Sequence, residues 1–123
     1  MFNVGAWSEK GVLSFNIIPG KSTSSSISTE GDQKINVDAL DNLITDGKAD
    51  FIKMDIEGAE LPALHGAKNL IQKNKPFLAI CVYHKAEDLI TIPQYIKELN
   101  KNYKFYLRQH EITTTELVLY AIP

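Results

Sequence analysis

The segment Phe51-Ile52-Lys53-Met54-Asp55-Ile56-Glu57-Gly58-Ala59-Glu60 joins a strand-like apolar run to three carboxylates and a glycine. An apolar strand that releases acidic side chains and passes into a helix is how an α/β sheet builds a site at a strand's carboxyl end. Acidic groups are too costly in a core to lie there without a role. The alternative is that Glu57 and Glu60 only favour the positive end of the following helix and lie in water.

Length and composition indicate one domain. The chain has 123 residues, of which 44% are apolar, and this is ample for a packed core. Its 13 basic and 15 acidic residues are interleaved, so there is no basic stripe for nucleic acid or an anionic membrane. Cys81 is the only cysteine, and neither a signal peptide nor an apolar stretch of bilayer length is visible. We therefore expect a cytoplasmic protein with no nucleic-acid or membrane partner.

The first 50 residues predict two short strands, a loop and a helical turn. The strand-like pieces 2–7 and 12–18 are separated by a turn and predict a hairpin. Residues 19–32, which include a run of serines, are typical of a loop. Residues 38–44 then predict a short helical turn that ends at Asp46-Gly47.

From residue 51 onward the predicted order is strand, helix, strand, helix, strand, strand. The first helix has Pro62 in its first turn and is split at Gly66. The unbroken apolar run 77–83 predicts a central parallel strand, and the capping pattern Thr91-Ile92-Pro93-Gln94 opens the next helix. Residues 103–108 and 115–122 predict two paired strands. We therefore expect an α/β fold whose sheet is mostly parallel and ends in an antiparallel hairpin.

The strands that end at Asp55 and His84 face the same edge of the predicted sheet. His84 is suited to take a proton from a substrate hydroxyl, and Asp55 is suited to orient either group. The alternative for His84 is a solvated loop histidine. A metal site from Asp55, Glu57 and His84 is conceivable, but their spacing matches no specific ligand pattern, and we predict no metal.

Other residues extend or limit the candidate site. Arg108 and His110 follow a later strand, where they are suited to hold a polar or anionic substrate group; a solvated hairpin end is the alternative. His65 lies within a predicted helix and is structural or exposed. An acid-pair glycosidase is excluded, since Asp55 and Glu57 share one side only while the strand lasts. The sequence has neither a Gly-x-Ser-x-Gly elbow nor a Gly-rich phosphate loop.

Residues 50–60, with Leu64-His65-Gly66-Ala67 after them, closely resemble the signature of the FkbM-type methyltransferase family. The resemblance covers essentially the whole chain. Supporting matches are Val37-Asp38-Ala39-Leu40-Asp41, Lys75-Pro76, Val82-Tyr83-His84, Tyr106-Leu107-Arg108 and Glu116-Leu117-Val118-Leu119-Tyr120-Ala121. The resemblance implies a partial Rossmann-like methyltransferase fold and an S-adenosylmethionine-dependent enzyme. Its implied acceptor is a hydroxyl oxygen of a small molecule or a glycan-like substrate.

The resemblance, together with chemical type, implies roles for six residues. Methyl transfer to oxygen needs an acceptor that is held in line with the methyl group and relieved of its proton. The implied catalytic residues are Asp55, which also contacts the cofactor, Glu57, and His84 as the base. The implied substrate-binding residues are Glu60, Arg108 and His110.

The amino-terminal part departs from the family pattern. The family's first strand with its Gly-rich cofactor loop, and the next strand with an acid for the ribose, have no counterpart, and residues 2–7 resemble its third strand. We therefore expect residues 1–123 to form a single domain that is the carboxyl-terminal part of such a methyltransferase domain. Strand 51–56 would then have an unpaired edge, which predicts a homo-oligomer or a hairpin folded against it. The alternative function is a non-catalytic interaction or acceptor-binding module.

Overall fold

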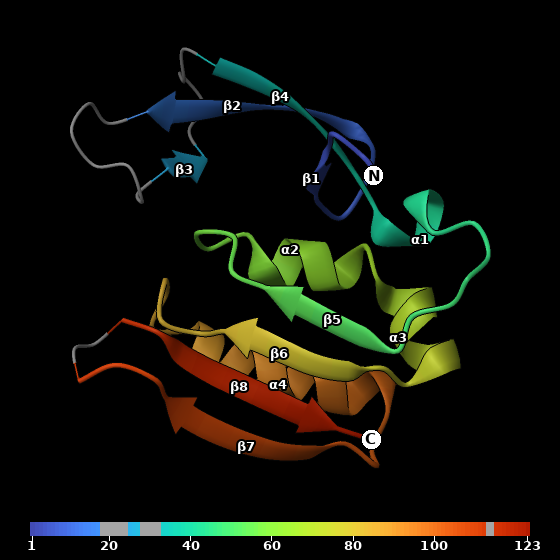
Figure 1. Ribbon diagram of the computed structural model, residues 1–123, viewed down its shortest axis with the longest axis vertical. Coiled ribbons are helices and arrows are strands. Elements are labelled where there is room, and N and C mark those ends of the chain that lie inside the picture. Colours follow the sequence, from blue (N-terminus) through green and yellow to red (C-terminus); the bar gives the residue numbers. More distant parts are fainter. Residues whose placement is uncertain (18–24, 28–32, 113–114) are drawn as a thin grey trace.

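The computed structural model has two four-stranded β-sheets, with the helices gathered around the second (Figure 1). The structure describes residues 1–17, 25–27, 33–112 and 115–123. We call the sheet with the order β1-β4-β2-β3 the amino-terminal sheet, and the sheet with the order β5-β6-β8-β7 the carboxyl-terminal sheet. The mixed α/β fold is as expected.

The amino-terminal sheet contains β1 (Gly5–Ala6), β2 (Gly11–Ile17), β3 (Ser25–Ile27) and β4 (Gln33–Asp38). The predicted hairpin of the first two strands is wrong, because β4 lies between them, parallel to β1 and antiparallel to β2. This placement buries Val37, which lies opposite Gly5 on one side and Gly11 on the other. β3 falls inside the predicted loop 19–32, and the rest of that loop lies outside the described residues.

Two contacts attach the amino-terminal part of the chain to the rest, one from helix α1 (Leu40–Leu43) and one from Trp7, which follows β1. The carboxylate of Asp41 accepts hydrogen bonds from the backbone N–H groups of Asn69 and Leu70, each at 2.9 Å. Gly66 lies against the backbone of Trp7, so closely that a Cβ there would be 1.9 Å from the Trp7 carbonyl oxygen. Only glycine fits this approach without a backbone shift.

The carboxyl-terminal sheet contains β5 (Phe51–Met54), β6 (Phe77–Cys81), β8 (Leu117–Ile122) and β7 (Lys104–Gln109). The predicted order of elements and the terminal antiparallel hairpin are confirmed. β6 is central, as predicted, but it is parallel only to β5 and antiparallel to β8. The parallel part of this sheet is therefore smaller than expected.

Three helices follow the strands of this sheet: α2 (Glu60–His65), α3 (Lys68–Asn74) and α4 (Asp88–Leu99). The predicted split at Gly66 is confirmed. The predicted cap at Thr91 is wrong, because α4 begins at Asp88 and the Thr91 hydroxyl donates to the Glu87 carbonyl, 3.1 Å away. No helix in the described part of the chain combines the length and the apolar content that a bilayer crossing needs.

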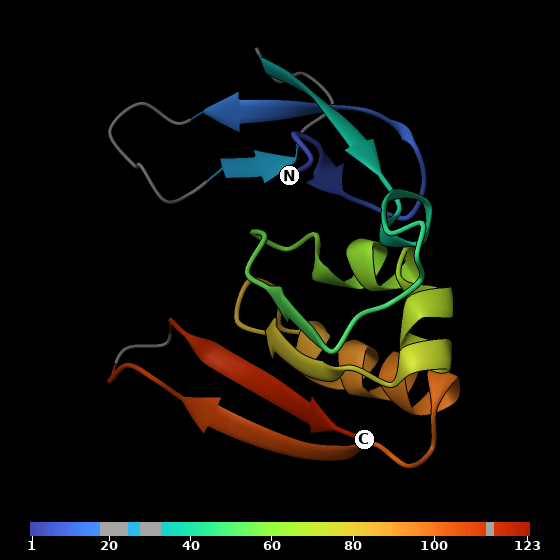
Figure 2. The same ribbon diagram turned by 45° about the vertical axis from the view of Figure 1, so that its right-hand side comes forward.

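The main core lies between the carboxyl-terminal sheet and the helices, which cover one side of it (Figure 2). β6 contributes Leu78 and Ile80, and α4 contributes Ile92 and Ile96, all fully buried. Tyr103 is also fully buried, and its hydroxyl donates a 2.7 Å hydrogen bond to the Pro76 carbonyl. The other face of the sheet carries no helix in the described part of the chain.

Strand β5 forms the border of the carboxyl-terminal sheet and pairs only with β6 among the described strands. No described strand of the amino-terminal sheet pairs with β5. The prediction that an amino-terminal hairpin covers this edge is therefore wrong. β1 is instead held beside β4, where it covers Val37. The homo-oligomer that we also predicted stays a prediction.

Candidate functional site

The turn between β5 and α2 is built around a buried acid. Asp55 follows the strand, and Glu57 and Gly58 then adopt the left-handed conformation, with φ values of 57° and 89°. The Glu60 side chain has no exposed surface, and its Oε1 accepts a 2.9 Å hydrogen bond from the Ile56 N–H. Glu60 therefore fixes the turn that presents the other two carboxylates.

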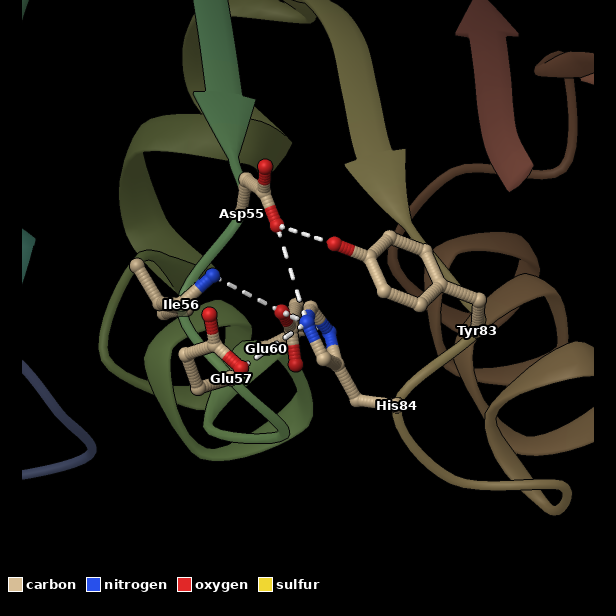
Figure 3. Close-up of polar contacts among 6 residues, drawn as sticks. All are labelled: Asp55, Ile56, Glu57, Glu60, Tyr83 and His84. Atoms are coloured by element: carbon tan, nitrogen blue, oxygen red, sulfur yellow. Dashed lines mark hydrogen bonds and ion pairs between the residues drawn. The ribbon is translucent and has the colours of Figure 1, made fainter. Parts of the chain in front are cut away.

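His84 lies at the centre of these acids (Figure 3). It follows β6, and its side chain is only 10% exposed. Its Nδ1 is 3.1 Å from Glu60 Oε1, and its Nε2 is 3.4 Å from Glu57 Oε2 and 3.7 Å from Asp55 Oδ1. The structure thus brings together the carboxylates and the imidazole that the sequence placed at one sheet edge.

Some polar atoms of this cluster are buried without a hydrogen bond. Among the described residues these include both ring nitrogens of His84, Oε2 of Glu60 and Oδ2 of the nearby Asp88. Burial, and then the charge of Glu60, raise the pKa of Asp88. Buried polar groups normally have partners, and each one left without a partner costs free energy.

Tyr83 and Cys81 lie beside Asp55 and keep their protons at neutral pH. The Tyr83 hydroxyl donates to Asp55 Oδ1 at 3.2 Å. Burial, followed by the negative charge of Asp55, raises the pKa of Tyr83 to about 12 and that of Cys81 to about 12. Tyr83 therefore serves as a hydrogen-bond donor, and Cys81 as a neutral thiol in the sheet.

A hollow of about 300 Å³ opens on the sheet face without helices, and Asp55 lies on its wall. Its lining residues come from β5, β6 and β8, from the turn after β5 and from the connection between β7 and β8: Phe51, Lys53, Asp55, Ala79, Cys81, His110, Glu116, Val118 and Tyr120. Nε2 of His110 is 2.8 Å from the Tyr120 hydroxyl. Asp55 therefore connects the buried cluster to a space of small-molecule size.

The predicted site residues are only partly brought together. Asp55, Glu57, Glu60 and His84 form one cluster, and His110 reaches the adjoining hollow. Arg108 is exposed on β7 and does not line the hollow.

Three of the alternatives for these residues are now decided. Glu60 is not in water, because it is buried, and His84 is not a solvated loop histidine, because its side chain is only 10% exposed. His65 is exposed and stacks on Tyr95, with ring centroids 4.2 Å apart.

Sequence reasoning missed Tyr83 and Tyr120. Tyr83 directly precedes His84 at the end of β6, and this adjacency was a usable signal. Tyr120 faces the hollow because it alternates with the core residues Leu119 and Ala121 along β8. Both hydroxyls add hydrogen-bonding capacity to the hollow and its edge.

Known proteins similar to this chain are methyltransferases by description. The model of the Methyltransferase FkbM domain matches residues 4–105. The crystal structure of Methyltransferase FkbM from Methylobacillus flagellatus KT superimposes with a TM-score of 0.78 and 33% sequence identity. The match covers 98% of this chain and 27% of that protein chain, so the chain spans about a quarter of its length. No curated protein matches the chain.

Proposed function

Because the chain belongs to the FkbM methyltransferase family, we propose that it carries the acceptor side of an S-adenosylmethionine-dependent methyltransferase. One observation supports this most: His84 lies within 3.7 Å of three carboxylates at the end of parallel strands, beside a hollow of small-molecule size. The proposed acceptor is a hydroxyl group of a small molecule or a glycan-like substrate.

The chemistry requires an acceptor oxygen in line with a methyl group on a positively charged sulfur, which S-adenosylmethionine supplies when bound. A carbon–oxygen bond forms as the carbon–sulfur bond breaks, and the hydroxyl proton must pass to a base. The carboxylate of Asp55 suits a cationic donor, because it lies at the sheet edge with its side chain 43% exposed. We assign Asp55 to positioning at this edge.

The proton acceptor in this proposal is Nε2 of His84. Oε1 of Glu60, 3.1 Å from Nδ1, favours the tautomer with its proton on Nδ1, and this leaves a lone pair on Nε2. Glu60 has no exposed surface, so we assign it to positioning His84 and not to the substrate contact predicted from the sequence. Glu57, with its side chain 37% exposed, is available to stabilise the protonated imidazole.

The acceptor would lie in the hollow next to Asp55. Phe51 and Val118 offer apolar contacts there, while His110 and Tyr120 offer hydrogen bonds. Arg108 is outside this lining, so its predicted substrate contact stays a prediction.

The test uses a longer family member of demonstrated activity and changes the residues aligned with Asp55 and His84. For Asp55→Asn we expect methyl transfer to fall by roughly 100-fold or more, because positioning of the reacting groups contributes on that scale. For His84→Ala we expect the largest loss with acceptors that are weak acids. Thermal unfolding of each variant, with Asp46→Asn as the matched surface change, separates chemistry from folding. Unchanged turnover after Asp55→Asn would remove the assignment.

For the 123-residue chain by itself we expect no saturable binding of S-adenosylmethionine or S-adenosylhomocysteine. Its seven glycines are scattered and form no Gly-rich loop after a strand, the element that lets a backbone approach such a cofactor closely. Calorimetric titration of the purified chain measures this directly. Saturable binding at micromolar concentration would show that the cofactor site is built in another way.

A further inference from the structure

We propose that Asp55, Glu60 and His84 bind a divalent transition-metal ion, with Glu57 as a further ligand. Neither the family match nor the function proposed above requires a metal. The spacing of Asp55, Glu57 and His84 along the chain matched no specific ligand pattern, and no metal was predicted from it. The folded chain adds Glu60, and one ligand atom from each of the three residues then lies within 4.8 Å of the others.

The two separations at Nε2 of His84 suit a shared ion better than direct hydrogen bonds, whereas the 3.1 Å from Nδ1 to Glu60 Oε1 is of hydrogen-bond length. Nε2 of His84 is 3.7 Å from Asp55 Oδ1 and 3.4 Å from Glu57 Oε2; the first separation is beyond hydrogen-bonding distance, and the second is long for such a bond. With metal–ligand bonds of about 2.1 Å, two ligands of one ion are roughly 3.0 Å apart in an octahedron and roughly 3.4 Å apart in a tetrahedron. Asp55 and Glu57 are partly exposed, so small side-chain rotations complete the set.

Atoms left without partners point to the same ion. Glu60 is fully buried and its Oε2 has no hydrogen bond, and Nε2 of His84, whose side chain is nine-tenths buried, has none either. Figure 3 shows Glu60 and His84 directed toward each other, with Asp55 and Glu57 around the imidazole. A divalent cation would satisfy these atoms and offset the excess of carboxylates over the single histidine.

The surroundings of the cluster hold its ligands in place. Tyr83 donates to Oδ1 of Asp55, and the Ile56 N–H donates to Oε1 of Glu60, so two of the carboxylates are oriented by other groups. Such outer contacts are typical of metal sites and strengthen binding. An imidazole among carboxylates suits Mn²⁺ or Zn²⁺ better than Ca²⁺ or Mg²⁺, which prefer oxygen ligands alone.

An ion bound to Nε2 would change the role of His84. The imidazole would then be a ligand and not the base, and the ion would lower the pKa of an acceptor hydroxyl bound to it. Metal binding is inferred from the geometry of the cluster alone. An experiment that contradicts it therefore leaves the proposed methyl transfer standing, and the reverse also holds.

The experiment titrates the purified chain, first treated with a chelator, with Mn²⁺ in a calorimeter and then displaces Mn²⁺ with Zn²⁺. We expect one ion per chain. Asp55→Asn and His84→Ala should each weaken binding at least about tenfold, the scale on which metal sites respond to changed ligands and partners. Glu98→Gln, a change of an exposed carboxylate on α4, should leave the affinity unchanged.

Circular dichroism melting shows whether each variant is folded. Asp55→Asn carries the test if His84→Ala fails to fold, because Asp55 is partly exposed and lies outside the core. The proposal is overturned if the folded chain binds neither ion saturably, or if folded Asp55→Asn binds Mn²⁺ as tightly as the unchanged chain. Absence of binding by the chain, with full methyl transfer by an active relative after chelation, would remove the metal and leave the methyltransferase proposal standing.

Discussion

The two sheets of this chain differ in how they are stabilised. The carboxyl-terminal sheet packs fully buried side chains such as Leu78 and Ile80 against its helices. In the amino-terminal sheet Val37 is buried, while Val12 is 59% exposed. The candidate site is built on the better packed sheet, which is where rigid positioning of catalytic or ligand groups is available. The amino-terminal sheet depends instead on a few specific attachments.

The largest contrast is expected from core truncation in the carboxyl-terminal sheet. Ile80→Ala removes a fully buried side chain and should lower the free energy of unfolding by about 2–5 kcal/mol. Val12→Ala, the matched change on the exposed part of the amino-terminal sheet, should cost no more than about 0.5 kcal/mol. Urea unfolding followed by circular dichroism compares them. Equal losses would contradict the difference in packing between the two sheets.

A smaller but more specific effect is expected at the attachment of the two sheets. Gly66→Ala places a Cβ against the Trp7 carbonyl and should cost about 1–3 kcal/mol. Gly11→Ala is the matched control, because a Cβ there meets Val37 only at 3.9 Å. Hydrogen exchange should show loss of protection in β1 and β4 before β6. If Gly66→Ala lowers the free energy of unfolding no more than Gly11→Ala does, the close approach of Gly66 to Trp7 does not hold the sheets together.

The hydrogen bonds of Asp41 should contribute about 1 kcal/mol, because they cap two N–H groups at the start of α3. Asp41→Ala removes both bonds, whereas Asp46→Ala removes a single exposed bond to the Lys48 N–H. Thermal melting of the two variants gives the difference. A melting temperature equal to that of Asp46→Ala would show that this link between the regions is weak.

Alkaline pH should lower the free energy of unfolding of the carboxyl-terminal region. Burial raises the pKa of Tyr103 to about 12, and an exposed tyrosine in the unfolded chain titrates near about 10. The unfolded state therefore loses its proton first, and this contribution to stability is present below about pH 10 and is lost between about pH 10 and 12. Tyr103→Phe should flatten that loss while costing about 1 kcal/mol at neutral pH. An unchanged pH profile in the variant would contradict the assignment to Tyr103.

The smallest effect concerns assembly. β5 borders the carboxyl-terminal sheet and pairs only with β6 among the described strands, so we predict weak pairing of this edge between two chains. The charge of Lys53 on the same strand should keep the dimer weak. Light scattering across a range of protein concentrations measures the mass. A single monomeric mass at every concentration would contradict the prediction.

The sequence predicted the carboxyl-terminal region better than the amino-terminal one. An unbroken apolar run such as that of β6 has few alternatives to a central strand. In contrast, β4 was missed although Ile35 and Val37 alternate with polar residues, and its insertion between β1, with which it pairs over two residues, and β2, with which it pairs over five, has no local signal in the sequence. Strand pairing between such short elements depends on contacts that are distant in sequence.

In the candidate site, too, some contacts between residues that are distant in sequence were not predicted. Asp55 and His84 were predicted to meet because the carboxyl ends of parallel strands share an edge. The burial of Glu60 was not predicted, since acids in the first turn of a helix usually face water. Its burial depends on the Ile56 N–H and on His84, and sequence spacing does not show either contact.

The left-handed conformation of Glu57 makes this position a compromise between stability and chemistry. Glycine adopts a φ of 57° without steric cost, whereas glutamate pays about 1 kcal/mol for it. Glu57→Gly should therefore raise the melting temperature while removing one of the carboxylates around His84. A directed-evolution screen for thermal stability alone would favour glycine at this position, and a selection for activity would restore glutamate.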